Sequence, residues 1–199
     1  MNDRLPLLRA LLVVAAAAGL AACEPDPGPR PMEGATMGGA FTLTAHDGRR
    51  VSSSEFAGKY RIVYFGYTHC PDICPVDLAS IGAALRRFEE AEPDRAARVQ
   101  PIFVTTDPAR DTPEVLRQFV DDFHPRLIGL TGTREEVMRV VAAHGASALP
   151  RTPAPGADGY LVDHSRLAVL YDPDGKPIVI LPAERGPDGV LAELERWVR

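Results

Sequence analysis

The chain has 199 residues, of which 45% are hydrophobic, 25% charged and 7% aromatic, and its formal net charge is −5. This composition is typical of a globular protein and excludes a collagen, a wholly disordered chain and a protein with several membrane spans. The negative charge argues against nucleic acid as a partner, because the phosphate backbone is also negative. The three cysteines, at positions 23, 70 and 74, are too few for a disulfide scaffold.

The first residues have the pattern of an export signal, predicted over residues 1–22. Arg4 and Arg9 precede an apolar run from Leu11 to Ala22, which is shorter than the roughly 20 residues that a spanning helix needs. The run ends in Leu20-Ala21-Ala22-Cys23, which resembles the lipobox of bacterial lipoproteins. We therefore expect cleavage before Cys23 and a lipid on its thiol. That lipid would anchor the protein to the membrane on the periplasmic side of the bacterial cell envelope. The alternative is an ordinary signal peptide with Cys23 near its cleavage site.

A flexible tether is predicted over residues 23–40. The segment is rich in proline and glycine and has no periodic apolar face, as expected of a linker that holds a domain off the membrane. Met32 and Met37 lie within it and offer thioether sulfurs to copper, although a plain linker role is the simpler interpretation. The remaining residues, 41–199, are expected to form one domain.

The first half of this domain predicts a hairpin, a strand and a helix. Two short extended runs, 41–44 and 49–53, flank Asp47-Gly48, which is a typical hairpin turn. Residues 61–67 are rich in β-branched and aromatic side chains and suit a buried strand. From Pro75 the apolar positions follow a helical period, and this helix should end before Pro93.

The second half predicts further strands and helices in alternation. A strand over 99–106 precedes a helix that begins near Pro113 and ends by Pro125, and residues 133–136 form a capping box for a third helix. Extended runs at 160–161, 166–171 and 177–181, with a turn at 172–175, precede a last amphipathic helix. A β-α-β unit followed by a β-β-α unit predicts an α/β, thioredoxin-like fold. Its central mixed sheet would be flanked by helices and preceded by the β-hairpin.

The strongest chemical signal is the pair Cys70 and Cys74, four residues apart and directly before the first helix. Pro75 suits the first helical position, and a helix N-terminus favours thiolate over thiol. Two such thiolates can bind one soft metal ion or close a disulfide. A purely structural disulfide is the alternative, but so small a loop gains little chain entropy.

The spacing of the pair favours a metal. Thioredoxin-type catalysts have two residues between their cysteines, whereas three residues, 71–73, lie between these. Zinc usually takes four protein ligands, whereas copper accepts two thiolates and one imidazole. A third ligand is therefore sought among the five histidines.

One histidine stands out by its position. His164 begins a strand after a loop rich in proline and glycine, and in a thioredoxin layout that loop lies against the cysteine loop. The others have simpler interpretations. His46 lies in the hairpin turn. His69 adjoins Cys70, points away and could tune its thiolate. His124 is at a helix end where an imidazolium suits the dipole, and His144 caps a helix.

Four motifs in order resemble the SCO/SenC copper-binding proteins of cytochrome c oxidase assembly. They are Phe65–Pro75, Thr106–Pro113, Leu127–Val137 and Tyr160–Ser165. The resemblance implies a thioredoxin-like fold and one copper ion, Cu(I) or Cu(II), held by Cys70, Cys74 and His164. It also implies delivery of that copper to the binuclear site of cytochrome c oxidase subunit II. A copper donor and a thiol reductant would be further partners. Many members use a membrane-spanning helix where this chain is expected to use a lipid.

Acidic residues near the motifs suggest supporting roles. Asp107 follows the second strand of the β-α-β unit and is a candidate for orienting the site from outside the ligand set. Asp111 could do the same, or could cap the next helix with Glu114 three residues on. Asp72 and Asp163 flank the expected ligands and either serve in docking or keep the loops solvated.

Three functions remain open on the sequence. The first is a copper metallochaperone, which is a binding protein rather than an enzyme. The second is a thiol-disulfide oxidoreductase with Cys70 and Cys74 as its catalytic pair, and the third is a redox or copper sensor. His164 favours the first, because dithiol exchange does not need a distant imidazole.

Overall fold

The computed structural model describes residues 27–152 and 159–199. Cys23 and the predicted signal at 1–22 lie outside the described residues. Within the described ranges, no helix has both the length and the apolar character needed to cross a bilayer.

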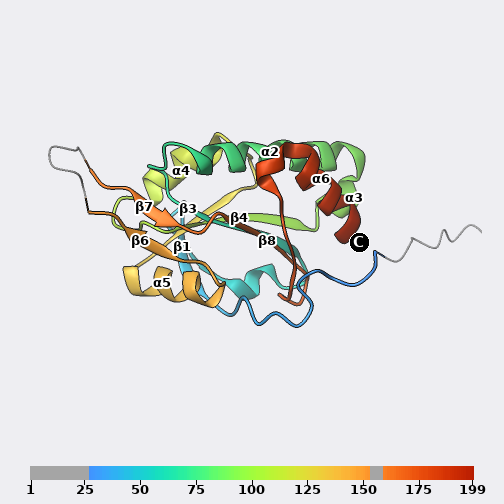
Figure 1. Cartoon of the computed structure of the whole chain (residues 1–199), viewed down its shortest axis with the longest axis horizontal. Coiled ribbons are helices and arrows are strands. Elements are labelled where there is room, and N and C mark those ends of the chain that lie inside the picture. The colour runs from blue at the N-terminus through green and yellow to red at the C-terminus, as the bar shows by residue number, and fades with distance from the viewer. Residues whose placement is uncertain (1–26, 153–158) are drawn as a thin grey trace, which may run out of the picture.

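A mixed seven-stranded sheet forms the centre of the domain, in the order β2-β1-β5-β4-β3-β8-β9. The three central strands β3, β4 and β5 run parallel, and β1, β8 and β9 are added antiparallel at the two sides. A separate antiparallel pair, β6 and β7, projects beyond the sheet (Figure 1). The strands are β1 Thr42–Ala45, β2 Arg50–Ser52, β3 Tyr60–Gly66, β4 Val99–Thr105, β5 Ile128–Thr131, β6 Ala148–Pro150, β7 Val162–His164, β8 Leu167–Tyr171 and β9 Pro177–Ile180.

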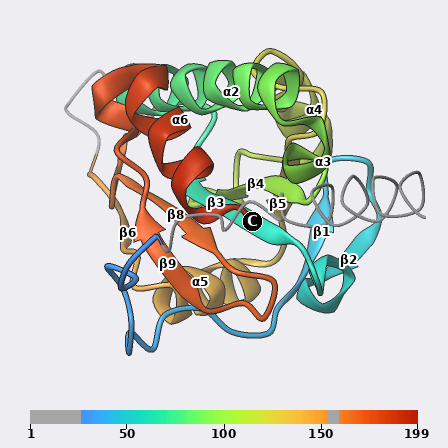
Figure 2. The ribbon, with the colours of Figure 1, turned by 90° about the vertical axis from the view of Figure 1, so that its right-hand side faces the viewer.

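Helices cover both faces of this sheet. Helices α2, α3, α4 and α6 lie on one face and α5 on the other (Figure 1), and the view from the side shows the same layers (Figure 2). The helices are α2 Ile73–Ala91, α3 Pro93–Ala96, α4 Pro113–Asp121, α5 Arg134–Ala143 and α6 Gly186–Trp197, with 3-10 turns η1 Ser53–Phe56 and η2 Ala183–Arg185. The predicted α/β, thioredoxin-like architecture with its N-terminal hairpin is confirmed.

Each face of the sheet has its own hydrophobic core. Side chains of β3 alternate between the two cores, as the period of a strand requires: Ile62 and Tyr64 face α2 and α6, whereas Val63 and Phe65 face α5. Because both faces are covered, the parallel strands are apolar throughout, which is why residues 61–67 are recognisable as a buried strand.

Several elements differ from the sequence predictions. Strand β5 was not predicted, because its four residues include a glycine and its burial comes from pairing with β1 and β4. Gly129 lies under helix α4, where a Cβ would lie 3.0 Å from a Val120 methyl carbon. The extended run predicted at 160–161 is displaced to strand β7, Val162–His164, so His164 ends a strand rather than beginning one. Strand β6 was not predicted, because it pairs only with β7 and no periodic pattern marks it.

The helix boundaries also shift. Helix α2 begins at Ile73, so Pro75 is its third residue rather than its first; a proline is still accepted there, since first-turn N–H groups have no helical partner. Helix α4 is capped by the side chain of Thr112, which accepts from the Val115 N–H. The alternative role of Asp111 as that cap is therefore wrong. The capping box at Thr133 is confirmed.

Residues 27–40 lie against the domain. The Met32 N–H donates to the Ile178 carbonyl on edge strand β9, and the Gly38 N–H donates to the Ala143 carbonyl at the end of α5. Met32 and Met37 pack against the hydrophobic core on the α5 side. The boundaries of the tether and of the signal stay predictions.

Two histidines are more buried than the sequence suggested. His124 accepts from the Arg126 N–H through Nδ1, and burial lowers its pKa, so the expected imidazolium at the helix end is wrong. His144 ends α5 as expected, with Nδ1 2.8 Å from the Val140 carbonyl oxygen, and burial lowers its pKa too.

The burial of His144 predicts a loss of stability in mild acid. Its pKa in the folded chain lies below the ordinary 6.5, so the unfolded chain takes up the proton first. The free energy of unfolding should therefore decrease as the pH falls below about 6.5, the ordinary pKa of histidine. The decrease is at most about 1.4 kcal/mol per pH unit for one such group. Denaturant unfolding of the reduced protein at several pH values between 7 and 5 measures this slope.

The variant His144→Asn isolates the contribution. Its amide can donate to the Val140 carbonyl as Nδ1–H does, but it does not titrate. The variant should be less stable at pH 7 and should have a shallower dependence on pH. An unchanged slope would contradict the assignment to His144.

Candidate metal centre

Three side chains far apart in sequence converge at one end of the sheet. Cys70, Cys74 and His164 each offer one ligand atom, and these atoms all lie within 4.8 Å of one another. The Cys74 Sγ is 3.3 Å from the His164 Nε2. Both cysteines are free thiols. This is the set predicted from the sequence, and the fold brings all three members together.

The cysteine loop is short and held at both ends. It leaves β3 at Gly66, and the Cys70 N–H donates to the Tyr67 carbonyl, so the chain turns back before α2 begins. Cys74 lies in the first turn of α2 and is fully buried, whereas Cys70 is 9% exposed. Of the two thiols, Cys70 is therefore the one nearer to solvent.

Gly66 makes room for the buried thiol. A Cβ at this position would lie 2.7 Å from the Cys74 Sγ and 3.0 Å from the Tyr64 ring. Its backbone angle is not unusual, so the requirement for glycine comes from this close approach. Gly66 lies within the first of the four sequence motifs, but no role was predicted for it.

His164 is oriented by the backbone of the next residue. Its Nδ1 lies 3.0 Å from the Ser165 carbonyl oxygen. A carbonyl can only accept, so Nδ1 carries the proton and Nε2 presents its lone pair to Cys74. Burial lowers the pKa of His164, which keeps the ring neutral near pH 7, as a metal ligand must be. The Tyr67 ring packs edge-on against it, with 5.6 Å between ring centroids.

The protonation of Cys74 differs from the sequence prediction. The helix N-terminus was expected to favour its thiolate, but burial raises the pKa of Cys74 to about 12. In the metal-free protein this group is therefore a thiol near neutral pH. A metal ion that binds it must displace the proton, so metal binding is coupled to proton release.

A buried carboxylate next to the cysteine turn of α2 stabilises the site. Asp77 lies one turn after Cys74 on α2 and is fully buried. It accepts from the Tyr64 hydroxyl at 3.1 Å and from the Arg166 guanidinium at 2.8 Å and 2.5 Å. Since Arg166 follows His164 by two residues, this two-bond contact ties the histidine loop to the helix that carries Cys74. Neither Asp77 nor Arg166 was predicted, because only the fold brings them together.

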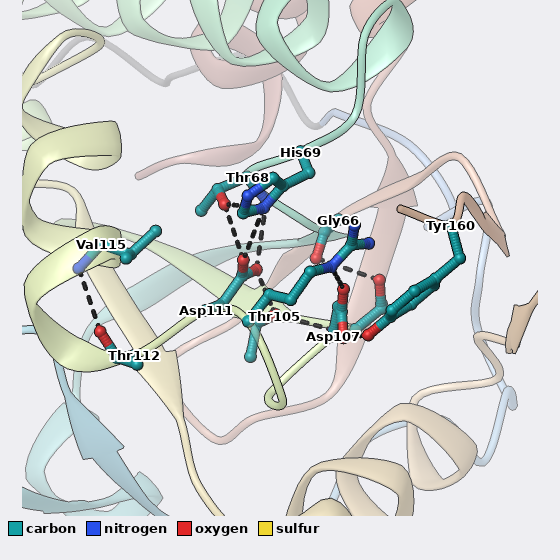
Figure 3. A network of polar contacts seen from close by, with 11 residues as sticks. Gly66, Thr68, His69, Thr105, Asp107, Asp111, Thr112, Val115 and Tyr160 are labelled. Atoms are coloured by element: carbon teal, nitrogen blue, oxygen red, sulfur yellow. Dashed lines mark hydrogen bonds and ion pairs between the residues drawn. The ribbon is translucent and has the colours of Figure 1, made fainter. Parts of the chain in front are cut away.

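Asp111 fixes the other side of the cysteine loop (Figure 3). It is fully buried and accepts from the Thr68 N–H at 3.1 Å, the Thr68 hydroxyl at 2.7 Å and the Thr105 hydroxyl at 2.5 Å. Burial raises its pKa, and these hydrogen bonds oppose that shift. His69 turns toward this group, with Nδ1 2.9 Å from the Thr68 Oγ1, and not toward the sulfurs.

Asp107 is linked to the metal site indirectly, through contacts with other side chains. One of its oxygens accepts from the Tyr160 hydroxyl at 2.7 Å (Figure 3). The other accepts from the Arg110 Nε at 2.5 Å. Arg110 lies over the Tyr160 ring and, at 5.7 Å, over the Tyr67 ring that contacts His164. Asp107 is thus two side chains away from the ligand histidine.

The other candidates lie apart from the metal cluster. His46 is half-buried and accepts from the Gly129 N–H at 3.0 Å, which joins the hairpin turn to β5. Asp72 is exposed and makes no capping bond at the start of α2. Asp163 is exposed and pairs with Arg151 at 2.6 Å across β6 and β7.

The fold and the cluster define a thioredoxin-like protein with a site suited to one copper ion. A thioredoxin domain of a thiol-disulfide oxidoreductase from Bacteroides vulgatus superposes with a TM-score of 0.56 over 82% of this chain and 96% of that chain. The two share 20% sequence identity, so the likeness shows the fold alone.

The chain belongs to the SCO1/SenC family, whose model matches residues 29–199. Protein sco1 of Schizosaccharomyces pombe is 42% identical over 145 residues, which are 72% of this chain and 54% of that protein. Protein SenC of Rhodobacter capsulatus is 42% identical over 153 residues, 77% of this chain and 65% of that protein. The chain thus spans about half to two thirds of these two relatives.

A copper-bound relative has the same architecture. The structure of Bradyrhizobium japonicum ScoI with copper bound aligns at a TM-score of 0.72 and 34% identity, over 81% of this chain and 99% of that chain. The family resemblance drawn from the four motifs is confirmed, and so is copper as the metal.

The contact at Gly66 predicts the effect of one added methyl group. Gly66→Ala should push the Cys74 sulfur away from His164 and destabilise the core by about 1–3 kcal/mol. Copper affinity, measured by competition with a chelator, should fall together with stability. Gly58→Ala is the control, because a Cβ at Gly58 would meet no atom of the described residues within 4 Å; its positive φ costs stability, but copper affinity should not change. Equal copper affinity in Gly66→Ala and the wild type would contradict this role.

Proposed function

We propose that this protein is a copper metallochaperone that delivers copper to the binuclear site of cytochrome c oxidase subunit II. In this role Cys70, Cys74 and His164 are the ligands of one copper ion. The observation that carries the proposal is the convergence of two free thiols and one oriented imidazole within 4.8 Å. Membership of the family supports the role in oxidase assembly.

The donor set suits a metal that is bound and then released. Two thiolates and an imidazole satisfy Cu(I), whereas zinc would lack a fourth protein ligand. Cys70 and His164 both keep some exposed surface, whereas Cys74 is fully buried. Copper can therefore approach from the side of Cys70 and His164 and pass to ligands of a partner by successive exchange.

Asp107 is proposed as a positioning residue for this site. It holds Tyr160 and Arg110 in place, and Arg110 lies over the ring that packs against His164. Asp107 therefore influences the angle at which the imidazole meets the metal, without touching the metal itself.

Thiol chemistry is the second candidate function. Cys70 and Cys74 are both free and are held close together in a thioredoxin-like fold. In an oxidising compartment they would form a disulfide, which offers no thiolate to copper. A thiol reductant is therefore a required partner of the chaperone, and exchange with the cysteines of the recipient is the corresponding activity of an oxidoreductase.

The two oxidation states of copper should depend differently on His164. Cu(I) is soft and is held mainly by the thiolates, whereas Cu(II) prefers nitrogen and oxygen donors. His164→Ala should weaken Cu(II) binding more than Cu(I) binding, and Cys70→Ser or Cys74→Ser should weaken both by orders of magnitude. Competition titrations of each variant measure this, with His69→Ala as the matched control because His69 faces Asp111.

An assay of cytochrome c oxidase activity in cells separates the two functions. A His164→Ala strain that retains dithiol exchange but loses oxidase activity would support the chaperone. Full oxidase activity in that strain at low copper would favour the oxidoreductase and would contradict the proposal.

We also propose that the mature protein begins at a lipid-modified Cys23 and faces the periplasm. The pattern Leu20-Ala21-Ala22-Cys23 is the support for this address. Cys23→Ser should block lipid attachment and leave the precursor unprocessed, as seen by mass spectrometry of the membrane fraction. An unmodified mature N-terminus elsewhere, with Cys23 removed, would refute the lipid anchor.

A further inference from the structure

A cavity of about 300 Å³ lies on the α5 side of the sheet, at the end of β3 away from the copper site. Its walls come from residues 38–41, η1, the end of α5 and the β8–β9 turn. Arg61 is the second residue of β3 and Gly66 the last, so the cavity is roughly 16 Å from the start of the cysteine loop. Such a volume is at the lower end of those that hold small organic ligands.

An unpaired arginine forms part of the wall. Among the described residues, the Arg61 guanidinium makes no hydrogen bond or ion pair, and its Nε is buried without a partner. It lies over the face of Tyr171, 5.8 Å from the guanidinium carbon to the ring centroid. Gly175 leaves space for it, because a Cβ there would overlap the guanidinium. Asp172 attracts this cation electrostatically but forms no hydrogen bond or ion pair with it. An anion bound in direct contact would therefore stabilise the half-buried guanidinium further.

A buried hydroxyl lies beside this cation. Tyr171 is 2% exposed, and its hydroxyl has no hydrogen-bond partner in the described part of the chain. Arg61 and Tyr171 are directly opposite each other in the pairing of β3 with β8, so both side chains point to the same face of the sheet. A guanidinium and a phenol hydroxyl both donate hydrogen bonds, and together they lack an acceptor.

The neighbouring charges are already used elsewhere. Asp172 pairs with Arg30 and accepts from the N–H groups of Asp174 and Lys176. Asp174 is exposed and lines the rim of the cavity. In an adjacent hollow, by contrast, Arg50 is paired with Glu136 at 2.7 Å. The Arg61 cavity therefore contains a half-buried arginine that no carboxylate of the described residues contacts.

We infer that this cavity binds a small oxyanion, a carboxylate or a phosphate, held by the Arg61 guanidinium and the Tyr171 hydroxyl. The site is separate from the copper ligands and does not depend on the proposed copper function. His144 contributes an aromatic wall, with its ring 5.6 Å from that of Tyr171.

Anion titration of the reduced, metal-free full chain in detergent tests this inference. Sodium phosphate and sodium succinate are the two probes, each compared with sodium chloride at equal ionic strength. Calorimetry and thermal unfolding should show saturable binding of at least one probe, and the arm that saturates identifies the class of anion. Arg61→Met should weaken binding at least tenfold. Tyr171→Phe should weaken it by about three- to tenfold, the worth of one hydrogen bond.

A control variant, together with Tyr171→Phe, makes the result decisive. Arg98→Met removes the same charge from an exposed arginine that lies 5.5 Å from the Tyr60 ring, and it should leave anion binding unchanged. Tyr171→Phe should not destabilise the anion-free protein, because the lost hydroxyl had no partner among the described residues, so this variant remains readable if Arg61→Met fails to fold. No saturable binding of either probe, or equal weakening by Arg98→Met and Arg61→Met, would overturn the inference.

Discussion

The close approach of β3 to the first turn of α2 is the constraint on which the site depends. The Cys74 sulfur lies directly against Gly66, and in this position it is 3.3 Å from the His164 Nε2. A larger residue at position 66 would separate the two. The short cysteine loop and the buried start of α2 together place a metal-binding sulfur inside a packed core.

This placement has a cost that the surrounding polar groups offset. Burial keeps Cys74 protonated until a metal displaces the proton, and the segments that carry the three ligands lie outside the main sheet or at its edge. Asp111 supplies bonds to the cysteine loop, and the Asp77–Arg166 pair joins the histidine loop to α2. Because Asp77 is fully buried, loss of Arg166 would leave an uncompensated buried charge next to the site. These contacts preorganise the ligands, so that little ordering is needed when copper binds.

The parts of the fold that carry a local signal could be predicted from the sequence. The apolar run of β3, the capping box at Thr133 and the turn before β9 depend on neighbouring residues alone. Strands β5 and β6 depend on pairing partners distant in the chain, so the sequence did not predict them, and it displaced β7 by two residues. The same distinction between local and distant signals applies to the three metal ligands. Cys70 and Cys74 were evident from spacing, whereas His164 became convincing only through the family resemblance.

Roles that depend on three-dimensional contact could not be predicted from single residues. Asp111 has the sequence context of a helix cap, yet it accepts from Thr68 and Thr105 because the end of β4 lies beside the cysteine loop. His124 has the context of a charged helix end, yet burial keeps it neutral. Gly66, Asp77 and Arg166 have no distinctive local pattern at all.

The most direct test of the central claim is X-ray absorption spectroscopy of the Cu(I)-loaded protein. The account predicts one copper ion per chain with two sulfur ligands and one nitrogen ligand, and the nitrogen should be lost in His164→Ala. A spectrum that is identical in the wild type and in His164→Ala would contradict the claim that these three side chains form one metal site.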